Sequence, residues 1–289
     1  MQTILNKYLP LFKLKICILI SVSAIVGLYL TSGGKITFTT TLLLVLTTLL
    51  ASGSASAFNH YFDIDIDTVM DRTRNRPLPT GLITNSKQVL WIAVIFFIAG
   101  VIISAWFLNY MVAIHLSLGA FVYGVVYTAW LKRRTWANII IGGLAGSFAV
   151  LAGGASAKPE LCAAPMLIAL VLFFWTPSHF WSFAIAYKDE YKKANIPMLP
   201  VVIGGHKTAV YIIINSLFLI ASSILPYYYG HLGLIYATAA VLAGGFFLFK
   251  NIQLLRDNSR EVAWNNFKAS IHYLWIIFIA IIVDVTIFK

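Results

Sequence analysis

The sequence predicts an all-α, polytopic membrane protein of about nine transmembrane helices around a central cavity that opens to the cytoplasmic side. Of the 289 residues, 60% are hydrophobic and only 11% are charged, and the mean hydropathy is +0.85, as in multi-span membrane proteins. Nine apolar segments are each near the ~20 residues that a bilayer core requires. We expect a single domain over residues 1–289, because no low-complexity tract or linker divides the chain.

The nine predicted spans leave two long loops. In chain order the spans are 14–31, 37–62, 88–108, 110–131, 137–157, 163–187, 208–229, 232–249 and 268–288. The first begins after two lysines and resembles the opening of a signal peptide, but no small-residue cleavage pattern follows it and eight further spans do. We therefore expect it to remain as a helix. The connections are short except over 63–87 and 188–207.

The distribution of basic residues predicts the orientation of the spans. With the N-terminus and the two long loops in the cytoplasm, all seven arginines and every lysine except Lys35, Lys158 and Lys289 lie on that side, as the positive-inside rule requires. We expect a multi-pass protein of the cell or inner membrane, with cytoplasmic active-site loops and its C-terminus outside. The positive-inside distribution of lysines and arginines accounts for the net charge of +11. We therefore expect the lipid bilayer, and no nucleic acid, as a partner.

The end of the second span carries the most informative pattern. Asn59, Asp63, Asp67 and Asp71 are spaced four residues apart, so on a helix they share one face. Carboxylates at the end of a membrane-buried helix are costly unless a positive charge lies between them. Mg²⁺ suits such a row, because it takes one or two carboxylates from a protein and completes its shell with water and substrate phosphate. Asp65 points about 160° away from the row, and we expect it to pair with an arginine.

Three arginines, Arg72, Arg74 and Arg76, follow the row directly. Guanidinium groups bind phosphate oxygens through planar, paired hydrogen bonds, so the segment indicates a metal and diphosphate clamp at a membrane surface. The competing interpretation is a solvated helix end whose acidic and basic side chains neutralise each other. Asn59 argues against it, because this residue lies where the apolar helix is still in lipid or protein.

A second acidic pair follows the sixth span. Asp189 and Glu190 emerge from an apolar segment among lysines, on the same predicted side of the membrane as the first cluster. Two acidic sites on one side can each hold a metal ion, with a diphosphate bridging them; a solvated helix end of mixed charge is the alternative. Pro197 and Pro200 predict that the following segment is a non-helical binding loop.

Four stretches of the sequence resemble the UbiA-type intramembrane prenyltransferases. They are NHYFDIDIDTVMDRTRNRPLPTG over 59–81, YTAWLKRRTWANIIIGGLAGS over 127–147, FFWTPSHFWSFAIAYKDEYKKANIPMLPVV over 173–202 and FKASIHYLWIIFIAIIVD over 267–284. The pattern N-x-x-x-D-x-x-x-D in the first stretch is similar to the first aspartate-rich motif of that family, whose members have nine helices and a second acidic motif after the sixth. The likeness is greatest to the branch that uses haem as acceptor.

The resemblance implies the transfer of a farnesyl group from farnesyl diphosphate to a vinyl group of haem B, with addition of water to give haem O. It implies Mg²⁺ as cofactor and a downstream haem A synthase or terminal oxidase assembly as the consumer of the product. Two features depart from relatives that act on aromatic acids. Tyr187 and Tyr191 stand in the places of the two aspartates of the second motif, and Tyr127 and Lys132 are five residues apart instead of four.

The charged residues can be assigned expected roles. An allylic diphosphate ionises when metal ions and fixed cations stabilise the charge on the leaving group. The expected metal ligands are Asn59, Asp63 and Asp67 for a first ion and Asp189 and Glu190 for a second, and the four carboxylates are the expected catalytic groups. The expected substrate contacts besides Asn59 are Arg72, Arg76, Tyr127, Lys132, Arg133, Lys188 and Tyr191. Surrounding aromatic side chains would shield the farnesyl cation from water.

His179 is the candidate for the haem half of the site. It follows Pro177 within the sixth span, where a helix distortion would open room for a ligand, and imidazole can ligate haem iron or hydrogen-bond a propionate. The alternative is a histidine that donates a hydrogen bond to a carbonyl of a neighbouring helix. Asp284, near the outer end of the last span, is far from both acidic clusters, and we expect it only to snorkel.

Two other functions compete with this interpretation. A related prenyltransferase would use a hydroxybenzoate or naphthoate acceptor and would differ in its acceptor pocket. A cation-coupled transporter would also carry intramembrane carboxylates, but transporters place them near the bilayer midplane on broken helices. Here both acidic clusters lie at one edge of the membrane among basic residues, which favours phosphate binding.

Overall fold

The computed structural model describes residues 7–288, and every regular element within them is helical. Nine helical spans in these residues are long and apolar enough to cross a membrane, which confirms the prediction of an all-α protein with about nine transmembrane helices. In chain order they are η1 with α2 (Leu9–Phe12 and Leu14–Thr31), α3 (Phe38–Phe62), α5 (Ser86–Phe107), α6 with η2 (Tyr110–Phe121 and Val122–Leu131), α7 with α8 (Asn138–Gly142 and Leu144–Ala157), α9 (Ala163–Ala186), α12 (Gly205–Tyr228), α13 (Leu234–Arg256) and α14 (Arg260–Phe288).

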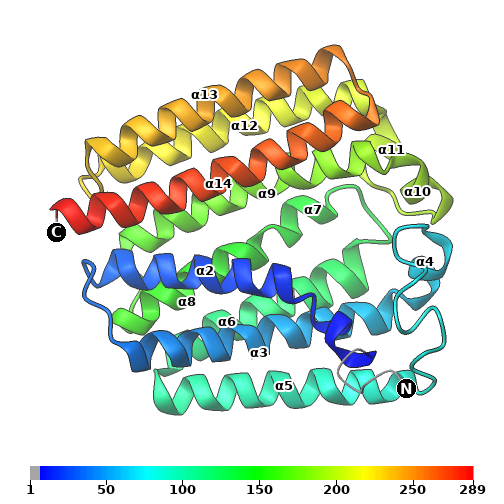
Figure 1. Ribbon diagram of the computed structural model, residues 1–289, viewed down its shortest axis with the longest axis horizontal. Helices are drawn as coiled ribbons and strands as arrows, with labels where there is room; N and C mark the ends of the chain where they lie inside the picture. Colours follow the sequence, from blue (N-terminus) through cyan, green and yellow to red (C-terminus); the bar gives the residue numbers. More distant parts are fainter. Residues whose placement is uncertain (1–6, 289) are drawn as a thin grey trace.

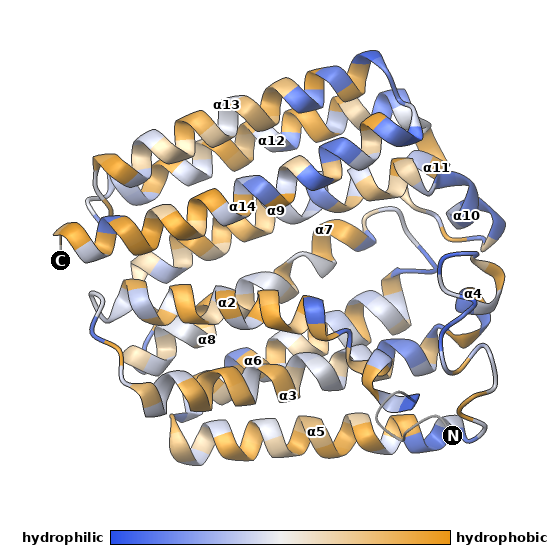
Figure 2. Cartoon of the chain, viewed as in Figure 1, coloured by the Kyte–Doolittle hydropathy of each residue, from blue (hydrophilic) through white to orange (hydrophobic). Residues whose placement is uncertain are grey.

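The spans pack as two groups of helices (Figure 1). α9, α12, α13 and α14 form one group, and α2, α3, α5, α6 and α8 form the other. The groups meet where α8 packs on α9 and where α2 packs on α9 and α14. The short helices α4 (Ile64–Val69), α10 (Lys188–Lys193) and α11 (Leu199–Ile203) lie together at one end of the bundle. Hydrophilic residues concentrate at this end (Figure 2), which we call the polar end.

Two predicted span boundaries and one predicted non-helical segment were wrong. α13 continues beyond residue 249 to Arg256, and α14 begins at Arg260 instead of residue 268. Hydropathy marks where an apolar segment stops, whereas helical hydrogen bonding continues into the polar turns beyond it. The segment after the second acidic pair is also partly helical, since it contains α11. Pro200 fits in the first turn of α11, because a backbone N–H at that position would have no partner within the helix.

Glycines allow α2 and α8 to touch through their backbones. A Cβ atom built on Gly153 would lie 1.8 Å from the carbonyl oxygen of Ala24, and one built on Gly27 would lie 2.1 Å from that of Val150. No larger side chain fits at these distances. Small residues permit such close packing of helices in membranes, and the contact fixes α2 and the residue that precedes it, Lys13, against the rest of the bundle.

Buried polar side chains connect α9 to α12, α13 and α14. Ser178 Oγ lies 3.0 Å from Ser216 Oγ, and Asn251 donates to Ser216 (2.8 Å). Asn266 donates to both Asn251 (2.9 Å) and Ser182 (2.8 Å). Single interhelical hydrogen bonds in membrane proteins contribute only about 0.6 kcal/mol on average, so these bonds act together to fix the register of α9.

Asp284 caps a neighbouring helix. Its carboxylate accepts the backbone N–H groups of Gly233 (2.6 Å) and Tyr236 (3.2 Å), which lie at the start of α13 and have no acceptor within that helix. The carboxylate also faces the positive end of the α13 dipole. The expectation that Asp284 only snorkels was wrong: the residue is 2% exposed and joins α14 to α13.

We expect Asp284→Ala to lower the free energy of unfolding by about 1–3 kcal/mol, because two N–H groups lose their acceptor away from water. Asp284→Asn keeps one acceptor oxygen and should lose less. Thermal unfolding in detergent measures the order, with Glu160→Ala as the control, since Glu160 is an exposed carboxylate in the connection between α8 and α9. Equal unfolding temperatures for the two alanine variants would contradict the capping role.

Candidate active site

Three residues of the predicted row line one buried face. α3 ends at Phe62 and α4 begins at Ile64, but the amide of Asp63 donates to the Asn59 carbonyl (3.0 Å) and that of Asp67 donates to the Asp63 carbonyl (2.7 Å). The helical spacing thus continues across the joint. Asn59, Asp63 and Asp67 are 3%, 1% and 2% exposed, so all three point into the protein.

The other two aspartates of this segment lie outside. Asp71 was predicted as a fourth member of the row, but α4 ends before it, and Asp71 is exposed and pairs with Arg74 (3.2 Å). Asp65 pairs with an arginine, as predicted: Arg133 donates to both of its oxygens (2.6 and 2.7 Å) and to the Phe62 carbonyl (2.6 Å). The Arg133 hydrogen bond holds the pKa of Asp65 below its usual range, so the pair persists at neutral pH and is lost as pH falls.

Arg133 was predicted to contact diphosphate. Its guanidinium instead fastens the joint between α3 and α4 from the outer side in this structure.

Two lysines from distant parts of the chain meet at Asn59 and Asp63. Lys13 donates to Asn59 Oδ1 (2.6 Å), and Asn59 Nδ2 donates to Asp63 Oδ2 (2.6 Å). Lys132 donates to the same carboxylate oxygen (2.5 Å). A buried carboxylate is strongly destabilising unless it is paired, and the two ammonium groups supply the compensating positive charge.

Asp67 has a partner of its own. Arg76 Nη1 donates to both carboxylate oxygens of Asp67 (2.9 and 2.7 Å), and such hydrogen bonds between ionised groups are stronger than those between neutral ones. The Thr73 hydroxyl donates to the Asp67 carbonyl (3.1 Å) and folds the following loop back over α4. We call the whole set the clamp; its members are Asn59, Asp63, Asp67, Lys13, Lys132 and Arg76.

The oxygen atoms of the clamp fit a hard divalent cation. Asp63 Oδ1 is buried and has no hydrogen-bond partner among residues 7–288, and an unpaired buried carboxylate oxygen is costly. Within the described part of the chain, no three His, Cys, Asp or Glu side chains gather as a complete metal site. An unpaired carboxylate oxygen without a complete set of protein ligands suits Mg²⁺, because that ion takes only one or two protein carboxylates and completes its shell with water and substrate phosphate.

A π-helical stretch brings Lys132 to the clamp. In η2 the amide of Lys132 donates to the carbonyl of Tyr127 (2.9 Å), five residues earlier. With hydrogen bonds of this i→i−5 type, residues five apart return to the same face of the helix. The local helix type therefore compensates for the unusual spacing of Tyr127 and Lys132.

The two residues of the second acidic pair, Asp189 and Glu190, have different surroundings. On α10, Asp189 is exposed and Lys188 is half-buried, whereas Glu190 accepts the backbone N–H of Arg72 (3.2 Å). Tyr191 is buried; burial raises the pKa of its hydroxyl, and the charge of Arg72 acts in the opposite direction. The structure thus brings Glu190 and Tyr191 toward Arg72 and leaves Asp189 outside.

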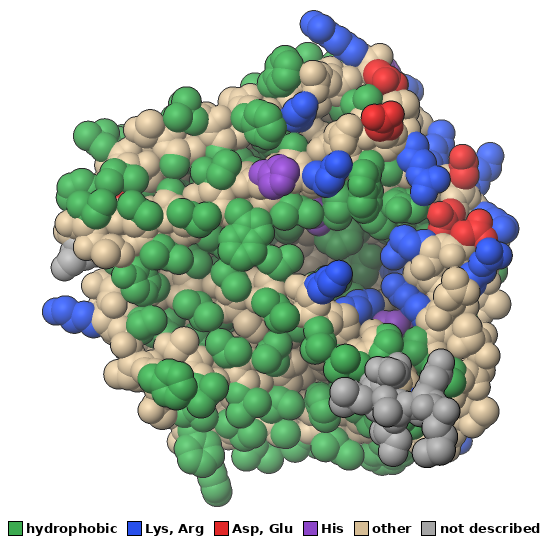
Figure 3. Space-filling model, in the orientation of Figure 1, with side chains coloured by type: hydrophobic (Ala, Val, Ile, Leu, Met, Phe, Trp, Pro, Cys, Tyr) green, Lys and Arg blue, Asp and Glu red, His purple; other side chains and the backbone are tan. Residues whose placement is uncertain are grey.

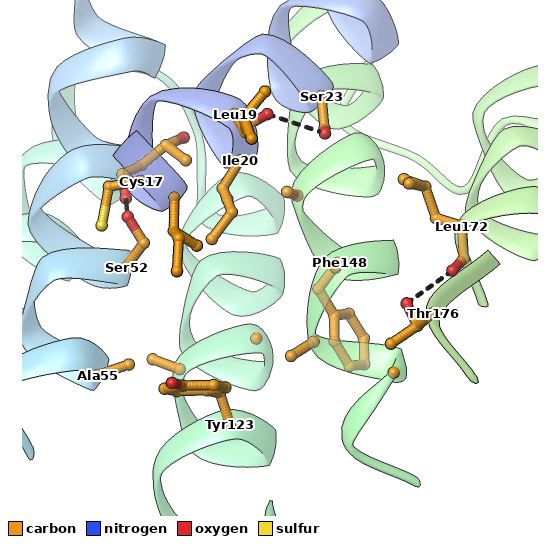
Figure 4. A pocket seen from close by; sticks show the side chains of 18 of the residues that line it. Cys17, Leu19, Ile20, Ser23, Ser52, Ala55, Tyr123, Phe148, Leu172 and Thr176 are labelled. Atoms are coloured by element: carbon orange, nitrogen blue, oxygen red, sulfur yellow. Dashed lines mark hydrogen bonds between the residues drawn. The ribbon is translucent and has the colours of Figure 1, made fainter. Parts of the chain in front are cut away.

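A cavity of about 260 Å³ adjoins the clamp at Lys13 and extends between the membrane-spanning helices. It lies between α2, α3, α6 with η2, α7 with α8, α9 and α14, and its lining is mostly apolar or small. Side chains from several of these helices, among them Tyr123, Phe148 and Leu172, reach into it (Figure 4). Lys13, which binds Asn59, also lines it, so clamp and cavity are continuous. The volume is near the lower end of the ~300–1,000 Å³ typical of small-molecule pockets, which suits one elongated apolar group.

His179 lines the same cavity in a fixed tautomer. Its Nδ1 lies 2.7 Å from Ser270 Oγ, and that hydroxyl donates its proton to the Phe267 carbonyl (2.6 Å). Ser270 must therefore accept from His179, so Nδ1 carries the proton and Nε2 keeps a free lone pair. The alternative of a bond to a backbone carbonyl was wrong. The helix also continues through Pro177 without interruption.

Lys13 and Ser270 are site residues that the sequence did not predict. Lys13 was treated only as an orientation charge, although Lys13 and Lys15 are about 200° apart on a helix and cannot both face solvent. In the structure Lys15 is exposed, whereas Lys13 joins η1 to α2 in a left-handed conformation (φ 44°) and reaches the clamp. Ser270 gave no signal, because its role depends on the packing of α14 against α9.

Comparisons with known proteins agree over nearly the whole chain. The model of the UbiA prenyltransferase family matches residues 20–281. The chain is 46% identical to "Protoheme IX farnesyltransferase 1" of Paramagnetospirillum magneticum, over 96% of this chain and 98% of that protein. It is 41% identical to "Protoheme IX farnesyltransferase" of Stutzerimonas stutzeri, over 96% and 92% of the two chains.

Solved structures share the fold. A digeranylgeranylglyceryl phosphate synthase matches with a TM-score of 0.81 at 23% identity, over 97% of this chain and 98% of that one. A UbiA homolog from Archaeoglobus fulgidus bound to DMAPP and Mg²⁺ matches with a TM-score of 0.75 at 17% identity, over 96% and 99% of the two chains.

We expect Lys13→Gln to weaken the binding of inorganic diphosphate by about tenfold to a hundredfold, the usual effect of losing a hydrogen bond from a charged group. Calorimetric titration in detergent measures the affinity. Lys15→Gln is the matched control, because Lys15 is an exposed lysine two residues away. The same affinity in both variants would show that Lys13 is only a surface charge.

Proposed function

The chain belongs to the UbiA prenyltransferase family, and from this membership we propose that it transfers a farnesyl group from farnesyl diphosphate to a vinyl group of protohaem IX (haem B), giving haem O. The observation that carries the proposal is the full-length likeness to proteins named protoheme IX farnesyltransferase. The polar clamp and the apolar cavity below it match the two ends of such a prenyl donor.

The proposed reaction balances without an oxidant or reductant. The bond between farnesyl C1 and the diphosphate oxygen breaks, and both electrons leave with the diphosphate. C1 bonds to the terminal vinyl carbon of haem B, water adds to the other vinyl carbon, and one proton is released. The product carries a hydroxyethylfarnesyl side chain.

The clamp would bind the diphosphate end of the donor. Asn59, Asp63 and Asp67 would hold Mg²⁺, which when bound supplies positive charge to the diphosphate oxygens. Lys13, Lys132, Arg72 and Arg76 would bind the same oxygens as fixed cations, and stabilisation of the leaving group lowers the barrier to ionisation. The proposed ligands of a second ion are Glu190 and Asp189, and the remaining proposed substrate contacts are Tyr127, Arg133, Lys188 and Tyr191.

His179 would bind the acceptor. Because its Nδ1 proton is held by Ser270, the atom that it can offer to a ligand is the Nε2 lone pair. A lone pair binds iron, whereas a propionate would require a donor proton. We therefore propose an axial contact between His179 and the haem iron.

The orientation of the chain is also a proposal. The arginines and most lysines lie at the polar end, so the positive-inside rule places the clamp in the cytoplasm and the C-terminus outside. A haem A synthase or a terminal oxidase assembly would receive the product. Membership of a prenyltransferase family leaves no support for a cation-coupled transporter, and the haem-named relatives favour haem over an aromatic acid as acceptor.

We expect Asp63→Ala and Asp67→Ala to reduce turnover by at least about 10³, because a ligand of the metal that stabilises the transition state is lost. Asp65→Ala should retain most activity, since Asp65 is an exposed partner of Arg133. Chromatographic detection of haem O formed from farnesyl diphosphate and haem B measures all three. Equal loss in the three variants would contradict the assignment of the buried face.

His179→Ala should weaken haem binding and shift the Soret band of bound haem, yet leave the affinity for farnesyl diphosphate nearly unchanged. Absorption titration and calorimetry measure the two affinities. His272→Ala is the control, because His272 is an exposed histidine on α14. An unaltered Soret band in His179→Ala would exclude the iron contact.

A further inference from the structure

A column of stacked aromatic rings runs along α9 and α14. Trp175 stacks on His179 with ring centres 4.2 Å apart and planes 20° apart, and His179 stacks on Phe267 at 4.3 Å and 30°. Phe267 in turn stacks on Trp264 at 5.0 Å and 22°. The first two rings come from α9 and the last two from α14, and we call the four together the ring column.

Ser270 fixes the end of the ring column that Trp175 and His179 form. Its carbonyl accepts the Trp175 indole N–H (2.7 Å), and its hydroxyl accepts the His179 Nδ1 proton (2.7 Å). Trp175 and His179 also line the cavity below the clamp. This end of the ring column is therefore rigid and faces the cavity in which the reaction is proposed to occur.

The polar end of the ring column carries two cations over one ring. Tyr187 packs edge-on against Trp264, with ring centres 6.0 Å apart. The guanidinium of Arg260 lies 5.0 Å from the centre of the Tyr187 ring, and that of Arg72 lies 5.7 Å from it. The ion pairs of the described residues all involve other side chains. Two guanidiniums near one ring, neither of them in an ion pair with a described residue, indicate a site for an anion.

The two arginines belong to different parts of the site. The backbone N–H of Arg72 is bound by Glu190, which ties Arg72 to the clamp side. Arg260 is the first residue of α14, the helix that supplies Trp264 and Phe267 to the ring column. Figure 3 shows the surface hollowed between α14 and α2, with basic side chains gathered on the side of the polar end.

We propose that Arg260 binds a propionate of the haem acceptor, with the macrocycle lying along the ring column. The proposal rests on the proposed function, because it names the acceptor contacts of that same site. Haem B is a planar, largely apolar ring with both carboxylates on one edge and both vinyl groups on the other half. A carboxylate held at Arg260 leaves the vinyl half toward the cavity, where the farnesyl chain would lie. The planar guanidinium matches a carboxylate through two hydrogen bonds.

The test compares haem B with its dimethyl ester, in which both propionates are neutral. Wild-type protein in detergent should bind haem B about tenfold to a hundredfold more tightly than the ester. Arg260→Gln should lose that preference and bind haem B and the ester alike. Arg260→Lys should keep part of it, because an ammonium retains the charge but not the planar fork. Arg256→Gln is the matched control, an exposed arginine at the end of α13 that should behave as wild type.

Two further measurements separate the possible failures. Arg260→Gln should bind a farnesyl diphosphate analogue with wild-type affinity, which shows that the variant is folded and that the clamp is intact. A wild-type preference for haem B that persists in Arg260→Gln would overturn the proposal while leaving the proposed function in place. Absence of haem binding in the wild-type protein would instead overturn the proposed function, and this proposal with it.

Discussion

The burial of two carboxylates at the end of a membrane-spanning helix is the constraint on which the rest of the structure depends. Asp63 and Asp67 are almost wholly buried, and each requires a positive partner because water cannot reach it. The chain supplies positive charge from three separate places. Lys132 after η2 and Arg76 in the loop after α4 pair with the carboxylates directly, and Lys13 before α2 binds Asn59, which in turn binds Asp63. The clamp thus exists only when three distant segments meet, which ties its chemistry to the fold as a whole.

Two packing features place those partners. Backbone contact between α2 and α8 at Gly27 and Gly153 fixes the helix that follows Lys13, and the π-helical stretch before Lys132 turns this lysine toward Asp63. On the other side of the cavity, Ser270 holds His179 and Trp175 to α14. The two groups of helices therefore contribute different halves: one supplies most of the diphosphate clamp, and the other supplies the rigid aromatic face proposed for the acceptor.

The sequence predicted the parts of this arrangement that depend on local periodicity. Nine spans follow from hydropathy, and the buried face of Asn59, Asp63 and Asp67 follows from four-residue spacing. The fourth member, Asp71, failed because spacing does not show where a helix ends. Lys13, Arg260 and Ser270 could not be found in this way, since their roles arise from contacts between segments far apart in the chain. The π-helix was also hidden, because only the geometry shows why a five-residue spacing still places Tyr127 and Lys132 together.

We propose that Asp63 and Asp67 hold a metal ion that binds together with the diphosphate, and that Lys132 and Arg76 then turn from the carboxylates to the diphosphate oxygens. The most direct test is the affinity of wild-type protein for a non-hydrolysable farnesyl thiodiphosphate, measured by calorimetry with Mg²⁺ and again with a chelator. The account predicts binding at least about a hundredfold tighter with Mg²⁺, because without the ion the two carboxylates repel the ligand and keep Lys132 and Arg76 to themselves. Equal affinity in the two conditions would contradict it and would make the clamp a purely cationic site.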